Sequence, residues 1–237
     1  NAYGIELDRI VRRAREPLAA EVRLQWWRDA IRGEGFGADA ADVPLVGALR
    51  DAMAAYGWPA DTLAAISEAR IHDLYADPFR TLDEFDGYAG EAYAAPLQLA
   101  AMAIAAETRG GDAGAVAARS AAVAAGHGGV ALAAADAIFE EGARLAMGRT
   151  HIPRDVWQSV GVLDLESALS QGRAPEALEA ALRAMIVHGR AADASFREAV
   201  AAVDPGARGA LLPAFAARPL LNAAAARPLA PRRPGPL

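Results

Sequence analysis

Residues 18–32 read LAAEVRLQWWRDAIR, and this stretch decides the fold class. Its apolar residues recur at helical spacing, in one row at positions 22, 26 and 30 and in a second row at positions 24, 27 and 31. An amphipathic helix has this period, whereas a strand alternates every two residues. The glycines at positions 33 and 35 favour an end to the helix. The stretch therefore predicts a helix over residues 18–32.

Two tryptophans, Trp26 and Trp27, are adjacent in that helix. Neighbouring helical side chains point about 100° apart, so the two rings are not expected to face the same core surface. One interpretation places one ring in the core and the other on a groove or a partner protein. The alternative is that both are partly buried anchors, as tryptophans commonly are. On the first interpretation, Trp26 and Trp27 are candidates for a partner-binding surface.

The rest of the chain repeats the helical signal. Hydrophobic residues make up 54% of the sequence and aromatic residues only 6%, and much of the hydrophobic share is alanine, the strongest helix former. Thr81 and Glu84 fit a capping box, and Asp61 fits an N-cap. Helices are expected over residues 5–15, 44–56, 61–74, 81–106 with a kink at Pro96, 115–147 with a weak point at 126–129, 163–170, 175–190, 192–203 and 207–217.

Helices joined by short loops predict an all-α protein, with a single compact helical domain over residues 1–226. The segment 227–237 is rich in proline and arginine and is expected to form a peripheral tail.

Composition argues against several classes of function. The net charge of −6 gives no basic footprint for nucleic acid. The absence of cysteine excludes disulfides, thiolate metal sites and a cysteine nucleophile. No apolar run reaches the roughly 18 residues of a membrane span. The longest candidate, residues 89–106, is interrupted by Glu91 and Pro96. We therefore expect a cytoplasmic protein.

Asp73 and Asp77 are spaced four residues apart at the end of a predicted helix. Two carboxylates at this spacing on one helical face are able to present ligands to Mg²⁺. The alternative is a solvated helix end, with Asp77 before Pro78 acting as a stop. The pair is a metal-site candidate only if the chain is an active enzyme.

The segment 148–153, GRTHIP, predicts a loop that offers Arg149 and His151 to an anion, or else a structural turn. The adjacent Glu140 and Glu141 diverge on a helix, which favours a solvated face for them.

Four segments together resemble the squalene/phytoene synthase family, and they occur in that family's order along most of the chain. They are residues 21–31 (EVRLQWWRDAI), residues 73–74 with 81–91 (DL with TLDEFDGYAGE), residues 148–155 (GRTHIPRD) and residues 211–215 (LLPAF). The resemblance implies the isoprenoid synthase fold. The doubled tryptophan and Glu6 resemble one branch in particular, the non-catalytic branch typified by an assembly factor of respiratory complex I.

Active members of this family condense two prenyl diphosphates head-to-head, and two aspartate-rich motifs hold the Mg²⁺ ions that neutralise the diphosphates. On this resemblance, the first motif falls on Asp8, Arg9 and Arg12, where only Asp8 remains acidic.

The second motif falls on Glu140 and Arg144, where one acid remains as glutamate and the other is arginine. His151 stands where the following loop of that family carries a tyrosine. These departures leave both acidic motifs degenerate, so we assign no catalytic residue and no cofactor, and Mg²⁺ would be needed only by an active enzyme.

Three hypotheses follow. The first is a pseudoenzyme that acts in respiratory complex I assembly or binds a prenyl lipid without turnover. The second is an active Mg²⁺-dependent prenyltransferase with a rearranged site that uses Asp73, Asp77 and Glu140. The third is a helical interaction domain without a pocket. The resemblance adds a location for the first hypothesis, peripheral to the inner membrane, or the mitochondrial matrix in a eukaryote.

Overall fold

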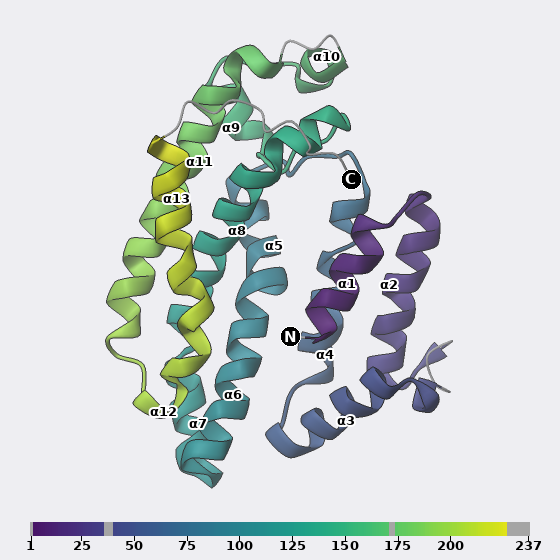
Figure 1. The fold of residues 1–237 in the computed structure, drawn as a ribbon, viewed down its shortest axis with the longest axis vertical. Helices are drawn as coiled ribbons and strands as arrows, with labels where there is room; N and C mark the ends of the chain where they lie inside the picture. Colours follow the sequence, from purple (N-terminus) through teal and green to yellow (C-terminus); the bar gives the residue numbers. More distant parts are fainter. Residues whose placement is uncertain (1, 36–39, 171–173, 227–237) are drawn as a thin grey trace. The chain divides into compact units, whose positions relative to one another are not determined.

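The computed structural model describes residues 2–35, 40–170 and 174–226 of the chain. It is 83% helical, and these residues contain no strand (Figure 1). The all-α fold class predicted from the sequence is confirmed. The predicted tail over residues 227–237 lies outside the described residues.

The chain divides into two compact units, and each is built from segments that are distant in the sequence. The first unit comprises Asn1–Tyr75, Ala95–Ala122 and Val203–Ala210. The second comprises Ala76–Ala94, Val123–Ala202 and Leu211–Leu237.

The first unit contains the N-terminal helices. Its elements are α1 (Ala2–Arg12), α2 (Pro17–Arg32), η2 (Ala40–Asp42), α3 (Pro44–Tyr56), α4 (Ala60–Ala69), η3 (His72–Leu74), α6 (Ala95–Arg109), α7 (Gly111–Ser120) and α12 (Pro205–Arg208). Proline in the first turn starts both α2 and α3, because it has no N–H group to leave unpaired there. Gly33 ends α2 with a left-handed φ of 71°. The helices predicted over 18–32 and 44–56 agree with the structure to within one residue.

Buried hydrogen bonds tie the N-terminal helices together. Tyr3 Oη of α1 donates to Leu63 O of α4 at 3.1 Å. Ser67 Oγ of α4 donates to Leu24 O of α2 at 2.6 Å. These two contacts fix α4 against both α1 and α2, which places the side chains of α1 discussed below.

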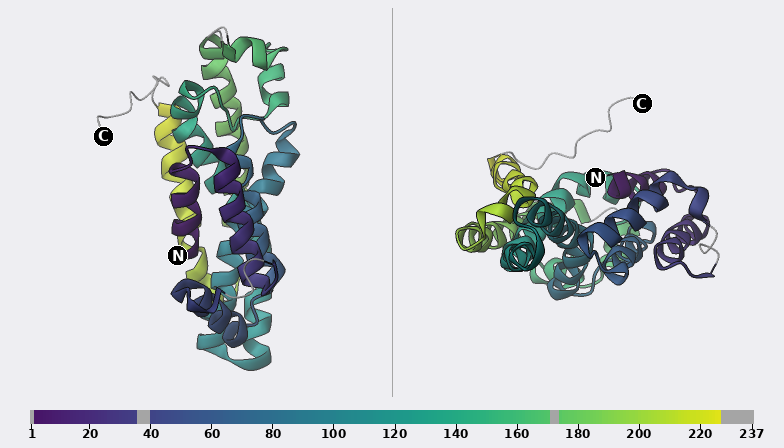
Figure 2. Two further views of the ribbon diagram at one scale, coloured as in Figure 1. Left: turned by 90° about the vertical axis from the view of Figure 1, so that its right-hand side faces the viewer. Right: turned by 90° about the horizontal axis from the view of Figure 1, so that it is seen from below.

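The second unit holds the long helices of the C-terminal half. Its elements are α5 (Leu82–Ala89), η4 (Gly90–Ala94), α8 (Ala122–Ala146), α9 (Arg154–Ser159), α10 (Leu165–Ser170), α11 (Ala174–Val200), η5 (Gly209–Ala216) and α13 (Ala217–Ala226). The first residue of α8 and the first two residues of η5 are assigned to the first unit. α13 lies alongside α11 (Figures 1 and 2).

The predicted weak point at residues 126–129 is wrong, because α8 runs unbroken through it and the break falls at Ala121. The glycines are there for close packing. A Cβ on Gly129 would lie 2.6 Å from the backbone N of Ala94, and one on Gly128 would lie 2.7 Å from the Cβ of Ala214. Glycine thus allows α8 to approach its neighbours more closely than alanine would.

Other predicted boundaries also change. Asp61 is not an N-cap, because α4 begins at Ala60 after Pro59. The separate helices predicted over 175–190 and 192–203 form one helix, α11. The kink predicted near Pro96 takes the form of one π-helical turn, η4, just before α6.

The predicted capping box is confirmed in part. Thr81 Oγ1 accepts from the backbone N–H of Glu84 at 3.2 Å, as predicted. The Glu84 carboxylate accepts from the backbone N–H of Arg80 at 2.7 Å.

One helix among the described residues, α8, is long and apolar enough to cross a membrane, with a hydropathy of 1.4 over its best window. This differs from the sequence-based expectation that residues 89–106 are the longest apolar run. Over half of that window, 56%, is buried inside the protein.

Candidate functional site

The positions that the family resemblance assigns to the first acidic motif lie on α1, and their one acid, Asp8, is paired with an arginine. Asp8 forms an ion pair with Arg70, which caps the C-terminus of α4. The same guanidinium contacts Asp73 at 2.9 Å. Arg9 pairs with Glu6 at 2.7 Å, one turn earlier on α1. The only carboxylate of the motif therefore already has a cation beside it.

The positions that the resemblance assigns to the second acidic motif lie near the end of α8, and they form an ion pair with each other. Arg144 Nη2 contacts Glu140 Oε2 at 2.8 Å, one turn away on the same helix. Arg144 Nη1 lies 2.8 Å from His151 Nε2. The arginine side chain is only 14% exposed, so this cation is fixed in place.

His151 is buried and does not face solvent. Its ring packs edge-on against Phe79 and Tyr88, with centroid distances of 5.7 and 5.8 Å. Of the two residues predicted to offer an anion contact, Arg149 is partly exposed, whereas His151 is 6% exposed. His151 thus places a ring nitrogen against Arg144.

Glu141 is the polar residue that the sequence interpretation placed wrongly. It was predicted to lie on a solvated face with Glu140, but it is fully buried. Thr150 Oγ1 donates to its Oε1, and the backbone N–H of His151 donates to its Oε2 at 3.3 Å. Burial raises the pKa of the Glu141 carboxyl from 4.5 to about 7, against the lowering effect of these hydrogen bonds.

A helical signal marks Glu141 in the sequence. It lies three and four residues after Ile138 and Ala137, which are both buried on the core face of α8. Its hydrogen bonds to Thr150 and His151 fasten the loop of residues 148–153 to this helix. Within the loop, Thr150 Oγ1 also accepts from the backbone N–H of Ile152 at 3.0 Å.

Asp73 and Asp77 do not share a helical face. Asp73 lies in the short 3-10 turn η3, with only 2% of its side chain exposed, and it pairs with Arg70. Tyr75 then continues in extended conformation, so Asp77 lies beyond the end of the helical segment. The arrangement proposed for Mg²⁺ at this pair is therefore wrong in its geometry. Within the described ranges, no three or more His, Asp or Glu side chains cluster so as to hold a metal ion.

The two tryptophans differ in burial, and the partly buried Trp26 packs against the core cluster that contains Trp27. Trp27 is 5% exposed and packs edge-on against Tyr3, with ring centroids 5.6 Å apart. Trp26 is half-buried and contacts Trp27 at a centroid distance of 5.2 Å. One ring therefore belongs to the core and the other reaches the surface.

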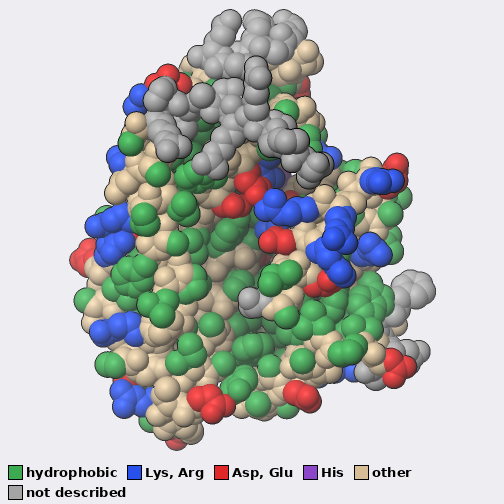
Figure 3. All heavy atoms as spheres, viewed as in Figure 1, with side chains coloured by type: hydrophobic (Ala, Val, Ile, Leu, Met, Phe, Trp, Pro, Cys, Tyr) green, Lys and Arg blue, Asp and Glu red, His purple; other side chains and the backbone are tan. Residues whose placement is uncertain are grey.

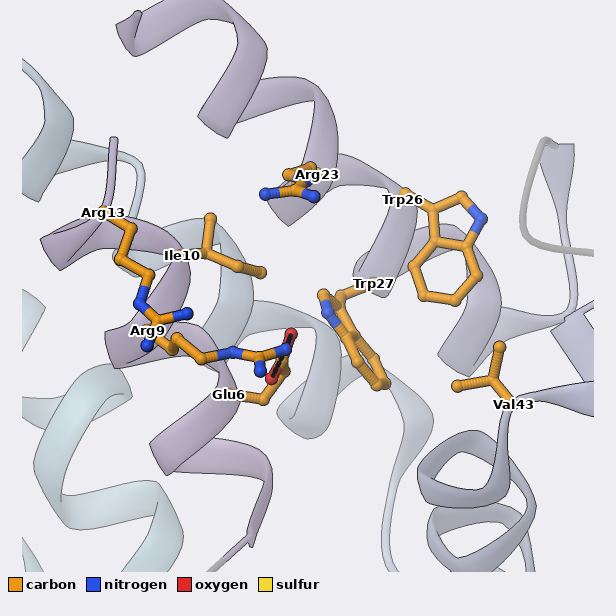
Figure 4. A pocket seen from close by; sticks show the side chains of 8 residues that line it. All are labelled: Glu6, Arg9, Ile10, Arg13, Arg23, Trp26, Trp27 and Val43. Atoms are coloured by element: carbon orange, nitrogen blue, oxygen red, sulfur yellow. Dashed lines mark hydrogen bonds and ion pairs between the residues drawn. The ribbon is translucent and has the colours of Figure 1, made fainter. Parts of the chain in front are cut away.

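A pocket of about 500 Å³ opens between α1 and α2. Its charged lining comes from Glu6, Arg9, Arg13 and Arg23, and Ile10 lies among them (Figure 4). Trp26, Trp27 and Val43 form the apolar wall. On the surface, Arg side chains gather over this part of the first unit, and hydrophobic side chains border them (Figure 3).

Comparison with known proteins places this geometry in a class. The structure is similar to the crystal structure of squalene synthase HpnC from Alicyclobacillus acidocaldarius, with a TM-score of 0.68 and 19% sequence identity, covering 94% of this chain and 79% of that one. The chain therefore has the isoprenoid synthase fold. No curated protein matches its sequence.

The family follows from the sequence itself. The family model described as squalene/phytoene synthase matches residues 1–234. The chain belongs to the squalene/phytoene synthase family.

Proposed function

We propose that this chain is a non-catalytic member of its family, which acts in the assembly of respiratory complex I or binds an isoprenoid lipid without converting it. One observation carries the proposal. At both positions where the family resemblance requires a Mg²⁺-binding motif, the remaining acid is paired with an arginine, Asp8 with Arg70 and Glu140 with Arg144.

Mg²⁺ requires a near-octahedral set of oxygen ligands, to which proteins contribute carboxylates. Arginine supplies no lone pair and remains positively charged. Arg9, Arg12 and Arg144 therefore repel Mg²⁺ at positions where the acidic residues of the family motifs would attract it. A prenyl diphosphate then lacks the metal clamp that stabilises its departing group.

The role in complex I assembly rests on the resemblance of the doubled tryptophan and of Glu6 to the assembly-factor branch. The structure adds a physical reason for this choice, since Trp26 is partly exposed while Trp27 is anchored in the core. A half-buried tryptophan on a fixed helix suits a protein-binding surface. This role places the protein in the cytoplasm or the mitochondrial matrix, peripheral to the inner membrane.

The first test is chemical. The purified chain is incubated with farnesyl or geranylgeranyl diphosphate and Mg²⁺, and diphosphate release and the melting temperature are measured. We expect no release. Release that stops on addition of a chelator would overturn the proposal and favour an active prenyltransferase. In that case Asp8→Asn and Asp73→Asn would identify which carboxylate supports turnover.

The second test is biological. In a host that depends on this chain for complex I, the double variant Asp8→Asn/Glu140→Gln is expected to restore assembled complex I as fully as the wild type. Trp26→Ala is expected to restore it poorly while remaining folded. If the double variant folds normally and fails to restore the complex, the motif acids have a role that the proposal denies.

A further inference from the structure

The pocket between α1 and α2 carries more positive charge than its protein surroundings neutralise. Arg9, Arg13 and Arg23 border one space (Figure 4). Of these, Arg9 is paired with Glu6. Over residues 2–35, 40–170 and 174–226, no carboxylate pairs with Arg13 or Arg23. Like charges in one concave site repel each other unless an anion joins them.

Helix electrostatics account for only part of this cluster. Arg13 directly follows the last turn of α1, where the helix dipole favours a cation. Arg23 lies inside α2, whose termini are Pro17 and Arg32, and gains nothing from either helix end. A smaller adjoining pocket of about 270 Å³ shares Arg13 and Arg23 and adds Arg15, so the positive region continues along the α1–α2 connection.

The pocket is separate from the degenerate acidic motif. Glu6 and Ile10 lie one turn apart on one face of α1, and Arg13 follows that face directly after the helix ends. Asp8 and Arg12 occupy another face, where Asp8 contacts Arg70. Only Arg9 belongs to both the motif and the pocket. The pocket is therefore a distinct site rather than a remnant of a metal site.

We propose that this pocket is a metal-independent binding site for the phosphate group of an amphiphilic ligand. Arg13 and Arg23 donate to the phosphate oxygens, because the planar guanidinium matches phosphate and binds it in a bidentate manner. Trp26, Trp27 and Val43 contact the apolar part of the ligand. The pocket volume of about 500 Å³ lies within the range of small-molecule sites. This site does not depend on the loss of turnover proposed above.

The test is calorimetric titration of the full chain in EDTA with dihexanoyl phosphatidic acid, a short-chain phosphate amphiphile. Dihexanoyl phosphatidylcholine is the ligand control. Saturable binding of the first is expected. Binding is expected to weaken about tenfold in Arg13→Gln and in Arg23→Gln, because each loses one charge-assisted contact. Added salt is expected to weaken it further.

A matched variant distinguishes the loss of a pocket arginine from the loss of one positive charge elsewhere on the protein. Arg119 on α7 is exposed and does not line the pocket, so Arg119→Gln is expected to bind like the wild type. Arg13 and Arg23 are both exposed, so their variants are expected to keep the wild-type melting temperature. Unchanged binding in the double variant Arg13→Gln/Arg23→Gln, or no saturable binding to the wild type, would overturn the proposal.

Competition with inorganic phosphate tests whether the site binds a free phosphate or needs a phosphate attached to an apolar group. Its competition with the amphiphile would support a site that accepts a free phosphate. Amphiphile binding without competition, weakened in Trp26→Ala, would support a ligand that needs both the headgroup and the apolar wall. Both results retain the arginine site, and the Mg²⁺-dependent turnover assay remains a separate test of the proposed function.

Discussion

Two glycines of α8 give a sharp test of how the second unit is packed. Gly126 and Gly129 lie in the same helix, one turn apart. A Cβ on Gly126 meets nothing within 4 Å. A Cβ on Gly129 would lie 2.6 Å from both the N and the Cβ of Ala94, within the π-helical turn η4. Alanine at these two positions changes the helix propensity equally and the packing very differently.

The free energies follow from these distances. Gly to Ala in a helix interior favours folding by about 1 kcal/mol. Gly126→Ala should therefore stabilise the fold by about 1 kcal/mol. At Gly129 the obstacle is backbone, which cannot rotate away, so the overpacking cost should approach the upper end, about 3 kcal/mol. The net destabilisation is about 2 kcal/mol, and the two variants differ by about 3 kcal/mol.

The assay is thermal unfolding followed by circular dichroism, with urea unfolding as a second measure. A change of 1 kcal/mol shifts the melting temperature by about 2–4 °C for a chain of this length, so the two variants should differ by about 6–12 °C. Equal melting temperatures, or a Gly129→Ala variant more stable than the wild type, would refute the close approach of α8 to η4.

Three further predictions concern single side chains, each measured by urea unfolding. The pKa of Glu141 is raised from 4.5 to about 7. Its stabilising contribution is therefore full below pH 4.5 and is lost as the pH rises through 7, which lowers the free energy of unfolding by about 3 kcal/mol. Glu141→Gln should remove this pH-dependent decrease in the free energy of unfolding. A parallel pH dependence in the variant would assign it to other groups. Thr81→Ala removes the cap on the Glu84 N–H and should cost about 1 kcal/mol at all pH values. Ser67→Ala removes the buried hydrogen bond to Leu24 O and should also lower the free energy of unfolding by about 1 kcal/mol. An unchanged urea midpoint in Thr81→Ala or in Ser67→Ala would contradict the hydrogen bond that the variant removes.

Sequence reasoning succeeded where one local signal has one physical meaning. Helical spacing and the glycines after residue 32 placed α2 to within one residue, and the range predicted for α3 agrees with the structure. Thr81 was recognised as a cap from its spacing to Glu84. These features depend only on neighbouring residues, so the sequence contains the necessary information.

It failed where the meaning depends on a distant partner. Gly128 and Gly129 were taken for a weak point because glycine disfavours helix, but their cause is contact with Ala94 and Ala214, far away in the chain. Glu141 was assigned to solvent because charged residues usually face water. Its hydrogen bonds come from Thr150 and His151, nine and ten residues later.

The candidate site shows the same division. The motif positions and the arginines that replace acids rest on the family resemblance and stay a prediction. The sequence did not show that Arg70 pairs with Asp8, because the partners are 62 residues apart. Nor did it show the pocket of Arg13 and Arg23, which exists only once α1 and α2 pack together.

The Glu140–Arg144 pair bears on the proposed non-catalytic function. In the resemblance, these positions hold two acids one turn apart, which repel each other unless Mg²⁺ lies between them. Replacing one acid by arginine turns that repulsion into an ion pair of 2.8 Å within the same helix turn. Arg144 also contacts His151, which links the pair to the loop after α8. Under the proposed non-catalytic function, the Glu140–Arg144 ion pair balances the charge of this helix turn without a metal ion.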